Sequence, residues 1–197
     1  MSADRYTLLA PSDGFVEVKG SKFICRLLPY EQYNTALAMA QKEHAKASHI
    51  IPVFRYMAED GETVVEGSSD DGEPGGTAGR PTLAVVQGAK LVNVGLYIVR
   101  YFGGTKLGTG PLARAYAASA RDAIEQANLV SWEPLRELIV AVPYDDVPKM
   151  ELVVRQMAPV GLERKHAATH VDYVFNGVKS AVDAAERQVV EARLFPE

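Results

Sequence analysis

The side chains most able to do chemistry lie in two glycine-rich stretches. The second stretch, residues 103–110, combines four glycines with Lys106, so its backbone can approach a ligand closely while the lysine supplies a positive charge. At the start of a helix, such a stretch favours an anion held by backbone N–H groups and the helix dipole. It is not a Walker loop, because Thr109 and Gly110 stand where Lys-Ser or Lys-Thr would follow. The alternative is a tight strand-to-helix turn that only packs the sheet.

The first stretch, residues 67–81, has no apolar periodicity and begins with clustered acids. Asp70, Asp71 and Glu73 could hold a hard cation, which prefers carboxylate oxygens. The alternative is structural: one carboxylate caps a turn and another pairs with an arginine such as Arg100. We therefore assign no metal site, no cofactor and no catalytic residue. The residues singled out around this loop are His49, Asp70, Asp71, Glu73 and Thr77.

Charge is distributed unevenly along the chain. The 197 residues carry 21 Lys and Arg against 25 Asp and Glu, and this net charge of −4 excludes a uniformly basic nucleic-acid binder. Residues 59–73 nevertheless contain seven acids and no Lys or Arg, whereas residues 74–121 contain six basic residues and no acid. We expect a local field that attracts anions. The candidate anion- or RNA-binding residues are Arg80, Arg100, Gly103, Gly104, Lys106, Gly108, Gly110 and Arg114.

The elements that would position these residues follow from apolar periodicity. A turn at Gly20-Ser21 and alternating residues on both sides predict a hairpin, and Thr109 with Pro111 predicts the start of a helix. In the N-terminal part, the expected strands span residues 15–18, 23–27, 50–57, 63–66 and 96–99, and the expected helices span 31–45, 82–87 and 109–128.

The pattern restarts after Trp132-Glu133-Pro134, which we interpret as a boundary. The C-terminal order is strand, helix, strand, strand, helix, which suits a small α+β sandwich. We predict two domains, residues 1–131 and 132–197. The expected C-terminal elements are strands at 138–142, 162–166 and 169–175, a helix capped by Asp145 that runs to Met157 and is broken at Pro159, and a helix at 178–191.

Cysteine usage and hydropathy indicate a location. Cys25 is the only cysteine, so the chain can form neither an internal disulfide nor a cysteine zinc cage. Asp4 and Arg5 interrupt any signal-like apolar run, and no run is long enough to span a membrane. We expect a cytoplasmic protein without a membrane partner.

The two stretches carry long motifs. Ser69-Asp70-Asp71-Gly72-Glu73-Pro74-x-Gly76-Thr77-Ala78-Gly79-x-Pro81, followed by Val99-Arg100-Tyr101-Phe102-Gly103-Gly104-x-x-Leu107-Gly108-x-Gly110-x-Leu112-x-Arg114-Ala115-Tyr116, resembles the YigZ/Impact family. The resemblance implies an α+β fold: an N-terminal domain like the second domain of ribosomal protein S5, and a C-terminal ferredoxin-like domain similar to part of elongation factor G. Eukaryotic relatives regulate translation during amino-acid starvation by competing for an activator of an initiation-factor kinase.

The chain departs from the family pattern at two places. His49-Ile50-Ile51 stands where His-Asn-Cys is common, which argues against a cysteine-based mechanism, and Pro111 replaces a more usual glycine.

These observations lead to a functional expectation. We expect a non-enzymatic regulator that binds RNA or a ribosome-associated protein through an anion-friendly cleft, without DNA sequence specificity. The family resemblance implies that the regulated process is translation. Arg100, Lys106 and Arg114 would meet phosphate or acidic groups. The alternative is a metal-assisted enzyme acting on a phosphorylated or nucleotide substrate, with Asp71 or Glu73 as metal ligand or general base. The sequence predicts no oligomeric state.

Overall fold

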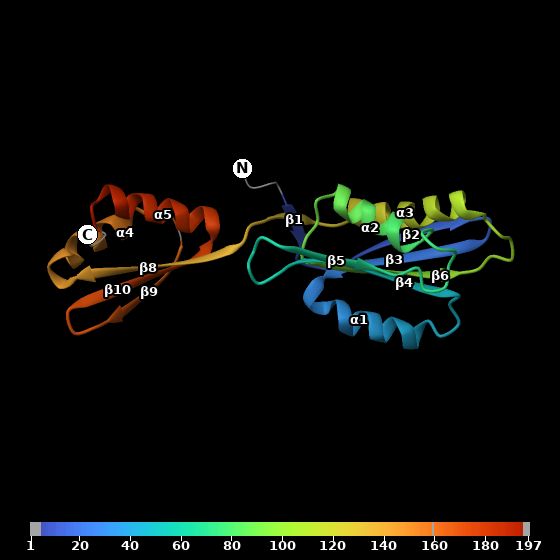
Figure 1. Cartoon of the computed structure of the whole chain (residues 1–197), viewed down its shortest axis with the longest axis horizontal. Coiled ribbons are helices and arrows are strands. Elements are labelled where there is room, and N and C mark those ends of the chain that lie inside the picture. The colour runs from blue at the N-terminus through green and yellow to red at the C-terminus, as the bar shows by residue number, and fades with distance from the viewer. Residues whose placement is uncertain (1–4, 159, 195–197) are drawn as a thin grey trace. The chain divides into compact units, whose positions relative to one another are not determined.

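The computed structural model describes residues 5–158 and 160–194 (Figure 1). Contacts divide the chain into two units, Met1–Trp132 and Glu133–Glu197, and each unit has its own buried apolar cluster. Both units combine helices with antiparallel sheets, which confirms the α+β class. Each unit is therefore described by itself.

A five-stranded antiparallel sheet forms the centre of the first unit. Its middle strand, β6, is buried along nearly its whole length, because neighbouring strands pair with both of its edges and helices cover both faces of the sheet. The order across the sheet is β2 (Ser12–Val18), β3 (Ser21–Pro29), β6 (Val94–Tyr101), β4 (His49–Met57) and β5 (Val64–Ser68).

Helices cover this sheet unequally. In Figure 1, α2 (Gly79–Gly88) and α3 (Thr109–Glu125) lie on one face, and α1 (Tyr30–Glu43) lies on the other. Helix α3 packs tightly against β2 because Gly14 has no side chain: a Cβ there would lie 2.4 Å from the backbone N of Ala123. This close approach holds the C-terminal half of α3 against β2.

A short pair of strands completes the first unit. β1 (Arg5–Leu8) pairs antiparallel with β7 (Leu129–Trp132), which places Trp132 in a strand of the first unit and not in a linker. Neither strand was predicted.

The second unit follows the predicted order of strand, helix, strand, strand, helix. Its sheet has the order β8-β10-β9, and helices α4 and α5 contribute Met150 and Val182 to a core around Tyr173. A 3-10 turn, η1 (Tyr144–Asp146), precedes α4. The bounds are β8 (Leu135–Pro143), α4 (Val147–Gln156), β9 (Gly161–His166), β10 (His170–Val178) and α5 (Lys179–Glu191).

Several predicted boundaries were wrong. Thr109 is the first residue of α3 and makes no capping hydrogen bond, because Gly108, with φ of 81°, occupies the cap position. Asp145 lies inside η1 and caps nothing. The long loop is shorter than predicted, because β5 extends to Ser68 and α2 already begins at Gly79. The predicted break at Pro159 lies outside the described residues.

None of the helices within the described residues combines the length and apolar character needed to cross a membrane.

Candidate functional site

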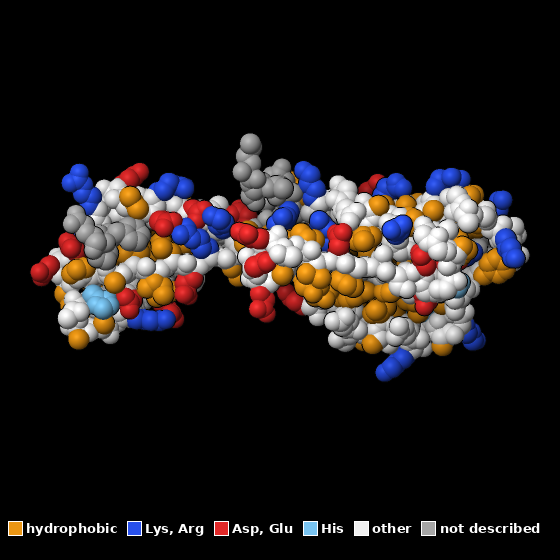
Figure 2. Space-filling model, in the orientation of Figure 1, with side chains coloured by type: hydrophobic (Ala, Val, Ile, Leu, Met, Phe, Trp, Pro, Cys, Tyr) orange, Lys and Arg blue, Asp and Glu red, His pale blue; other side chains and the backbone are white. Residues whose placement is uncertain are grey.

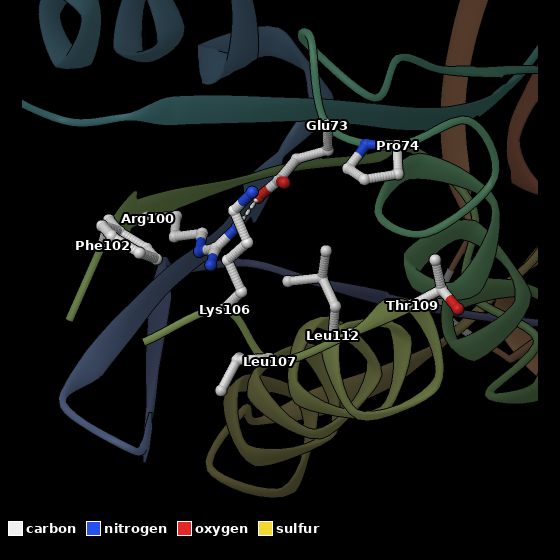
Figure 3. Close-up of a pocket in the computed structure, with 9 residues that line it drawn as sticks. Glu73, Pro74, Arg100, Phe102, Lys106, Leu107, Thr109 and Leu112 are labelled. Atoms are coloured by element: carbon white, nitrogen blue, oxygen red, sulfur yellow. Dashed lines mark hydrogen bonds and ion pairs between the residues drawn. The ribbon is translucent and has the colours of Figure 1, made fainter. Parts of the chain in front are cut away.

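The two motif stretches meet at one cavity of about 340 Å³ in the first unit (Figure 3). The first stretch contributes Glu73 and Pro74 from its middle, the second contributes the turn before α3, and the C-terminal end of β6 lies between them. The lining residues are Glu73, Pro74, Arg100, Phe102, Lys106, Leu107, Gly108, Thr109 and Leu112. We call this cavity the Arg100 cleft.

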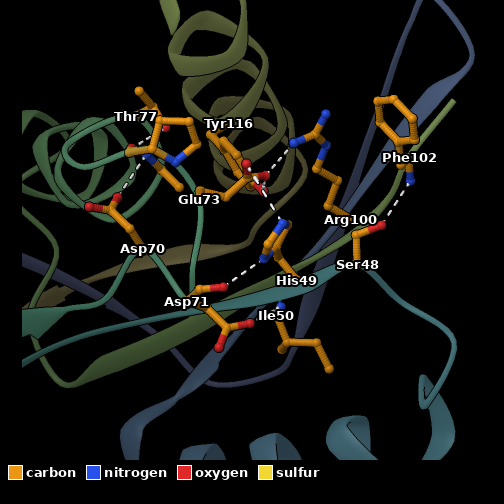
Figure 4. Close-up of polar contacts among 12 residues, drawn as sticks. Ser48, His49, Ile50, Asp70, Asp71, Glu73, Thr77, Arg100, Phe102 and Tyr116 are labelled. Carbon is orange, nitrogen blue, oxygen red and sulfur yellow. Dashed lines mark hydrogen bonds and ion pairs between the residues drawn. The ribbon is translucent and has the colours of Figure 1, made fainter. Parts of the chain in front are cut away.

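A buried polar network forms its inner wall (Figure 4). Arg100 is only 6% exposed, and its Nη1 donates a hydrogen bond to Glu73 Oε1. Tyr116 donates from its hydroxyl to the same oxygen, at 2.6 Å. Burial and this hydrogen bond to Glu73 raise the pKa of Tyr116, so the residue stays a neutral donor. Glu73 therefore pairs with Arg100, as the structural alternative for the acidic cluster predicts.

One atom of this wall lacks a partner. Arg100 Nε is buried, and no described residue accepts its hydrogen. The guanidinium lies 5.5 Å from the ring centre of Phe23 and 5.8 Å from that of Phe102. Leaving a buried donor unsatisfied costs about 1–3 kcal/mol, so this arginine is held in place at an energetic cost.

His49 approaches Glu73 from the start of β4. Its Nδ1 lies 2.6 Å from the carbonyl oxygen of Asp71, and since a carbonyl only accepts, Nδ1 carries a hydrogen. Its Nε2 lies 3.8 Å from Glu73 Oε2. Asp71 itself, at φ of 44°, accepts a hydrogen bond of 2.7 Å from the backbone N–H of Ile50. These contacts attach the acidic loop to β4.

Asp70 holds the loop from the other side. Its carboxylate accepts hydrogen bonds from the backbone N–H groups of Gly76, Ala78 and Gly79, at 2.7–2.9 Å, and so caps α2. Partial burial alone would raise the pKa of Asp70, but these hydrogen bonds and the nearby Arg80 lower it. This remote cap explains why α2 begins earlier than predicted. Thr77 is buried and donates to the carbonyl of Pro74.

The outer part of the cleft is electropositive. Helix α3 has no acidic residue in its first turn and no side-chain cap, and its N-terminus reaches the cleft at Gly108 and Thr109. Lys106 is exposed and forms no ion pair with any carboxylate in the part of the chain that the structure describes. Figure 2 shows further Lys and Arg side chains on the part of the first unit where α2 and α3 lie.

Some predicted residues lie elsewhere. Arg80 lines a separate polar cavity of about 370 Å³ beside Asp70. Arg114 is exposed on α3 next to Gly110 and does not line the cleft. Gly103 serves packing, because a Cβ there would lie 2.1 Å from the carbonyl carbon of Gly20 in the β2–β3 turn. Gly104 has a positive φ of 84° and open space around it.

Six residues of the site were not predicted as such: Pro74, Phe102, Leu107, Thr109, Leu112 and Tyr116. Pro74 lies in the first motif and the other five lie within the second, and Leu112 and Tyr116 fall inside the expected helix 109–128. Phe102 is half exposed, at 50%, and its place directly after an apolar strand was the available signal.

We found no metal-binding arrangement among the described residues, since no group of three or more His, Cys, Asp or Glu side chains converges.

Comparison with known proteins gives consistent relatives. The Impact N-terminal domain matches residues 19–124. The IMPACT family member YigZ of Escherichia coli (strain K12) is 34% identical over 150 residues, which cover 75% of this chain and 73% of that protein. The IMPACT family member YvyE of Bacillus subtilis (strain 168) is 29% identical over 171 residues, covering 85% and 77%. A crystal structure described as that of a hypothetical protein aligns over 100% of this chain and 99% of that chain, with 26% identity and a TM-score of 0.65.

Proposed function

This chain belongs to the IMPACT family, and from that premise we propose that it is a cytoplasmic regulator of translation that binds RNA through the Arg100 cleft. The translation part of this proposal rests on family membership, because the resemblance to this family implies translational control in its eukaryotic members. The part concerning RNA rests on one observation: an unpaired lysine, an uncapped helix N-terminus and a half-exposed phenylalanine surround a single cavity.

The electrostatics of the cleft support a phosphate-bearing ligand. Lys106 contributes a full positive charge, and the N-terminus of α3 contributes about half a charge. The absence of acids from residues 74–121 leaves this field uncancelled by neighbours in sequence, although the chain as a whole is acidic. A phosphate backbone would therefore be attracted to Lys106 and the N-terminus of α3.

Phe102 favours RNA over an isolated anion. An exposed aromatic ring beside a phosphate site is how proteins bind single-stranded RNA, since unstacked bases stack on it. A site for a small inorganic anion would gain nothing from this ring, nor from the leucine side chains that line the cavity.

The acidic residues do not favour the alternative of a metal-assisted enzyme. Asp70 caps α2, Asp71 holds Ile50, and Glu73 is paired with Arg100 and Tyr116. Each carboxylate thus has a structural partner that explains its presence.

The test is a gel-shift titration with ribosomal RNA fragments at low salt, followed by co-sedimentation with ribosomes. We expect Lys106→Glu to weaken binding at least tenfold, because a charge-assisted hydrogen bond is worth about 1.5–3 kcal/mol. Lys42→Glu is the matched control: Lys42 is exposed in the last turn of α1, on the opposite face of the sheet, and its replacement should change affinity by less than about threefold.

Failure of the wild-type protein to bind at low salt, or an equal loss in both variants, would refute the proposed function. Co-sedimentation with ribosomes that persists in excess competitor RNA would point instead to a protein partner. That result would also overturn the proposed function.

A further inference from the structure

The composition of the cleft walls shows which part of a ligand would enter. A volume of about 340 Å³ lies within the range of about 300–1,000 Å³ that is typical of small-molecule sites. Pro74, Leu107 and Leu112 give most of the lining an apolar character. A phosphate group alone would lose its hydration against such walls, whereas a flat heterocycle would bury its faces there.

The polar groups have a definite order from inside to outside. The inner wall carries Arg100 and Glu73, whose opposite charges cancel, and both side chains are more than nine-tenths buried. The outer part carries Lys106 and the open end of α3, which no described acid neutralises. A neutral group with hydrogen-bonding edges therefore suits the inner wall, and an anion suits the mouth.

The inner wall also offers unused hydrogen-bonding capacity. Glu73 Oε2 makes only the 3.8 Å approach to His49, so this carboxylate can accept a further hydrogen bond. Figure 3 shows the carboxylate beside the cavity with one oxygen turned away from the guanidinium. A fixed acceptor of this kind matches the N–H donors on the edge of a nucleobase.

Phe102 completes the arrangement. The guanidinium of Arg100 lies 5.8 Å from the centre of the Phe102 ring, yet Phe102 remains 50% exposed. An accessible ring at the mouth can hold a base by stacking, and the stacked base would have its backbone near Lys106.

We propose that the Arg100 cleft takes in one unstacked nucleotide of single-stranded RNA, with its base inside against the Arg100–Glu73 pair and Phe102, and its phosphate outside at Lys106 and the N-terminus of α3. This inference rests on the proposed function and names the part of the RNA that the cleft recognises. It predicts that the bases, and not only the backbone, contribute to affinity.

The experiment measures fluorescence anisotropy with a short single-stranded RNA and with a ribose-phosphate polymer of equal length that lacks bases. Stacking is worth about 1–3 kcal/mol per base, so Phe102→Ala should weaken RNA binding about 5- to 150-fold. Phe15→Ala is the matched control, because Phe15 lies on β2 and is 51% exposed, close to the 50% of Phe102. It should change affinity less than twofold, and neither variant should lower the melting temperature.

The wild-type protein should also bind the baseless polymer at least fivefold more weakly than the RNA, and Phe102→Ala should abolish that preference. Equal affinity for both polymers, or equal effects of the two alanine variants, would overturn the inference while leaving RNA binding through the cleft intact. A complete lack of RNA binding by the wild type would overturn the proposed function first and the inference with it.

Discussion

Replacing Glu73 with glutamine removes one charge from a buried ion pair and leaves its shape almost unchanged. Both side chains are buried, at 7% exposure for Arg100 and 4% for Glu73, so solvent cannot compensate the guanidinium. Removing one partner of such a pair costs about 3–5 kcal/mol. We expect about 3 kcal/mol for Glu73→Gln, because the amide oxygen still accepts hydrogen bonds from Arg100 or Tyr116. For a unit of this size, that loss lowers the melting temperature by about 10 °C.

The assay is thermal and urea unfolding followed by circular dichroism and by tyrosine fluorescence. Asp13→Asn is the control, since the Asp13–Arg26 pair is solvent-exposed, at 65% and 44%, and its loss should cost less than about 1 kcal/mol. If Glu73→Gln proves too unstable to purify, the double variant Glu73→Gln with Arg100→Met removes the uncompensated charge and should recover at least about 1 kcal/mol. A loss no larger than that of the control, or no recovery in the double variant, would refute the account of the inner wall.

Three further outcomes follow from the structure. The pKa of Asp70 is lowered on folding, so its stabilisation is present above about pH 4 and is lost as the pH falls through the lowered pKa; the difference in unfolding free energy between wild type and Asp70→Ala, about 1–2 kcal/mol at neutral pH, should therefore shrink on acidification, and a constant difference would contradict the capping role. Gly103→Ala should destabilise the first unit by at least about 2 kcal/mol in urea unfolding, because its Cβ would meet backbone at 2.1 Å, whereas Gly88→Ala, with nothing within 4 Å, should be neutral or stabilising by up to about 1 kcal/mol; similar effects would be inconsistent with the close approach. Met150→Ala should lower the free energy of unfolding of the second unit by about 2–5 kcal/mol, and so shift only the calorimetric transition of that unit. A shift of both transitions would show that the two units do not unfold independently.

The sequence shows the two motifs but not the contacts between them. Glycines and the end of an apolar strand are local signals that mark both motifs, and the structure brings residues of both to one cavity. The pairing of Glu73 with Arg100 was weighed only as an alternative, since adjacent acids carry no information about their distant partners. The hydroxyl of Tyr116 reaches an acid 43 positions earlier, and helical periodicity shows only that its ring is buried.

The fold was predictable where elements are long and regular. The strands around Gly20 and the order of elements in the second unit were correct, because alternation and helical spacing extend over many residues there. The start of α2 was not, since its cap is supplied by Asp70 from outside the helix and not by a neighbouring Ser or Thr. The start of α2 was therefore missed because its capping group is remote in sequence.

The N-terminus of α2 is capped by a side chain and that of α3 is not, and this difference has a consequence for natural variation. The protein fills the N-terminus of α2 with its own Asp70 carboxylate but leaves that of α3 open, beside Lys106. The Asp70 carboxylate thus stabilises the folded first unit, whereas Lys106 forms no ion pair with the residues that the structure describes. A relative that has lost Asp70 should carry compensating changes within its own chain. A relative that has lost Lys106 should keep a normal fold and, under the proposed function, bind RNA more weakly.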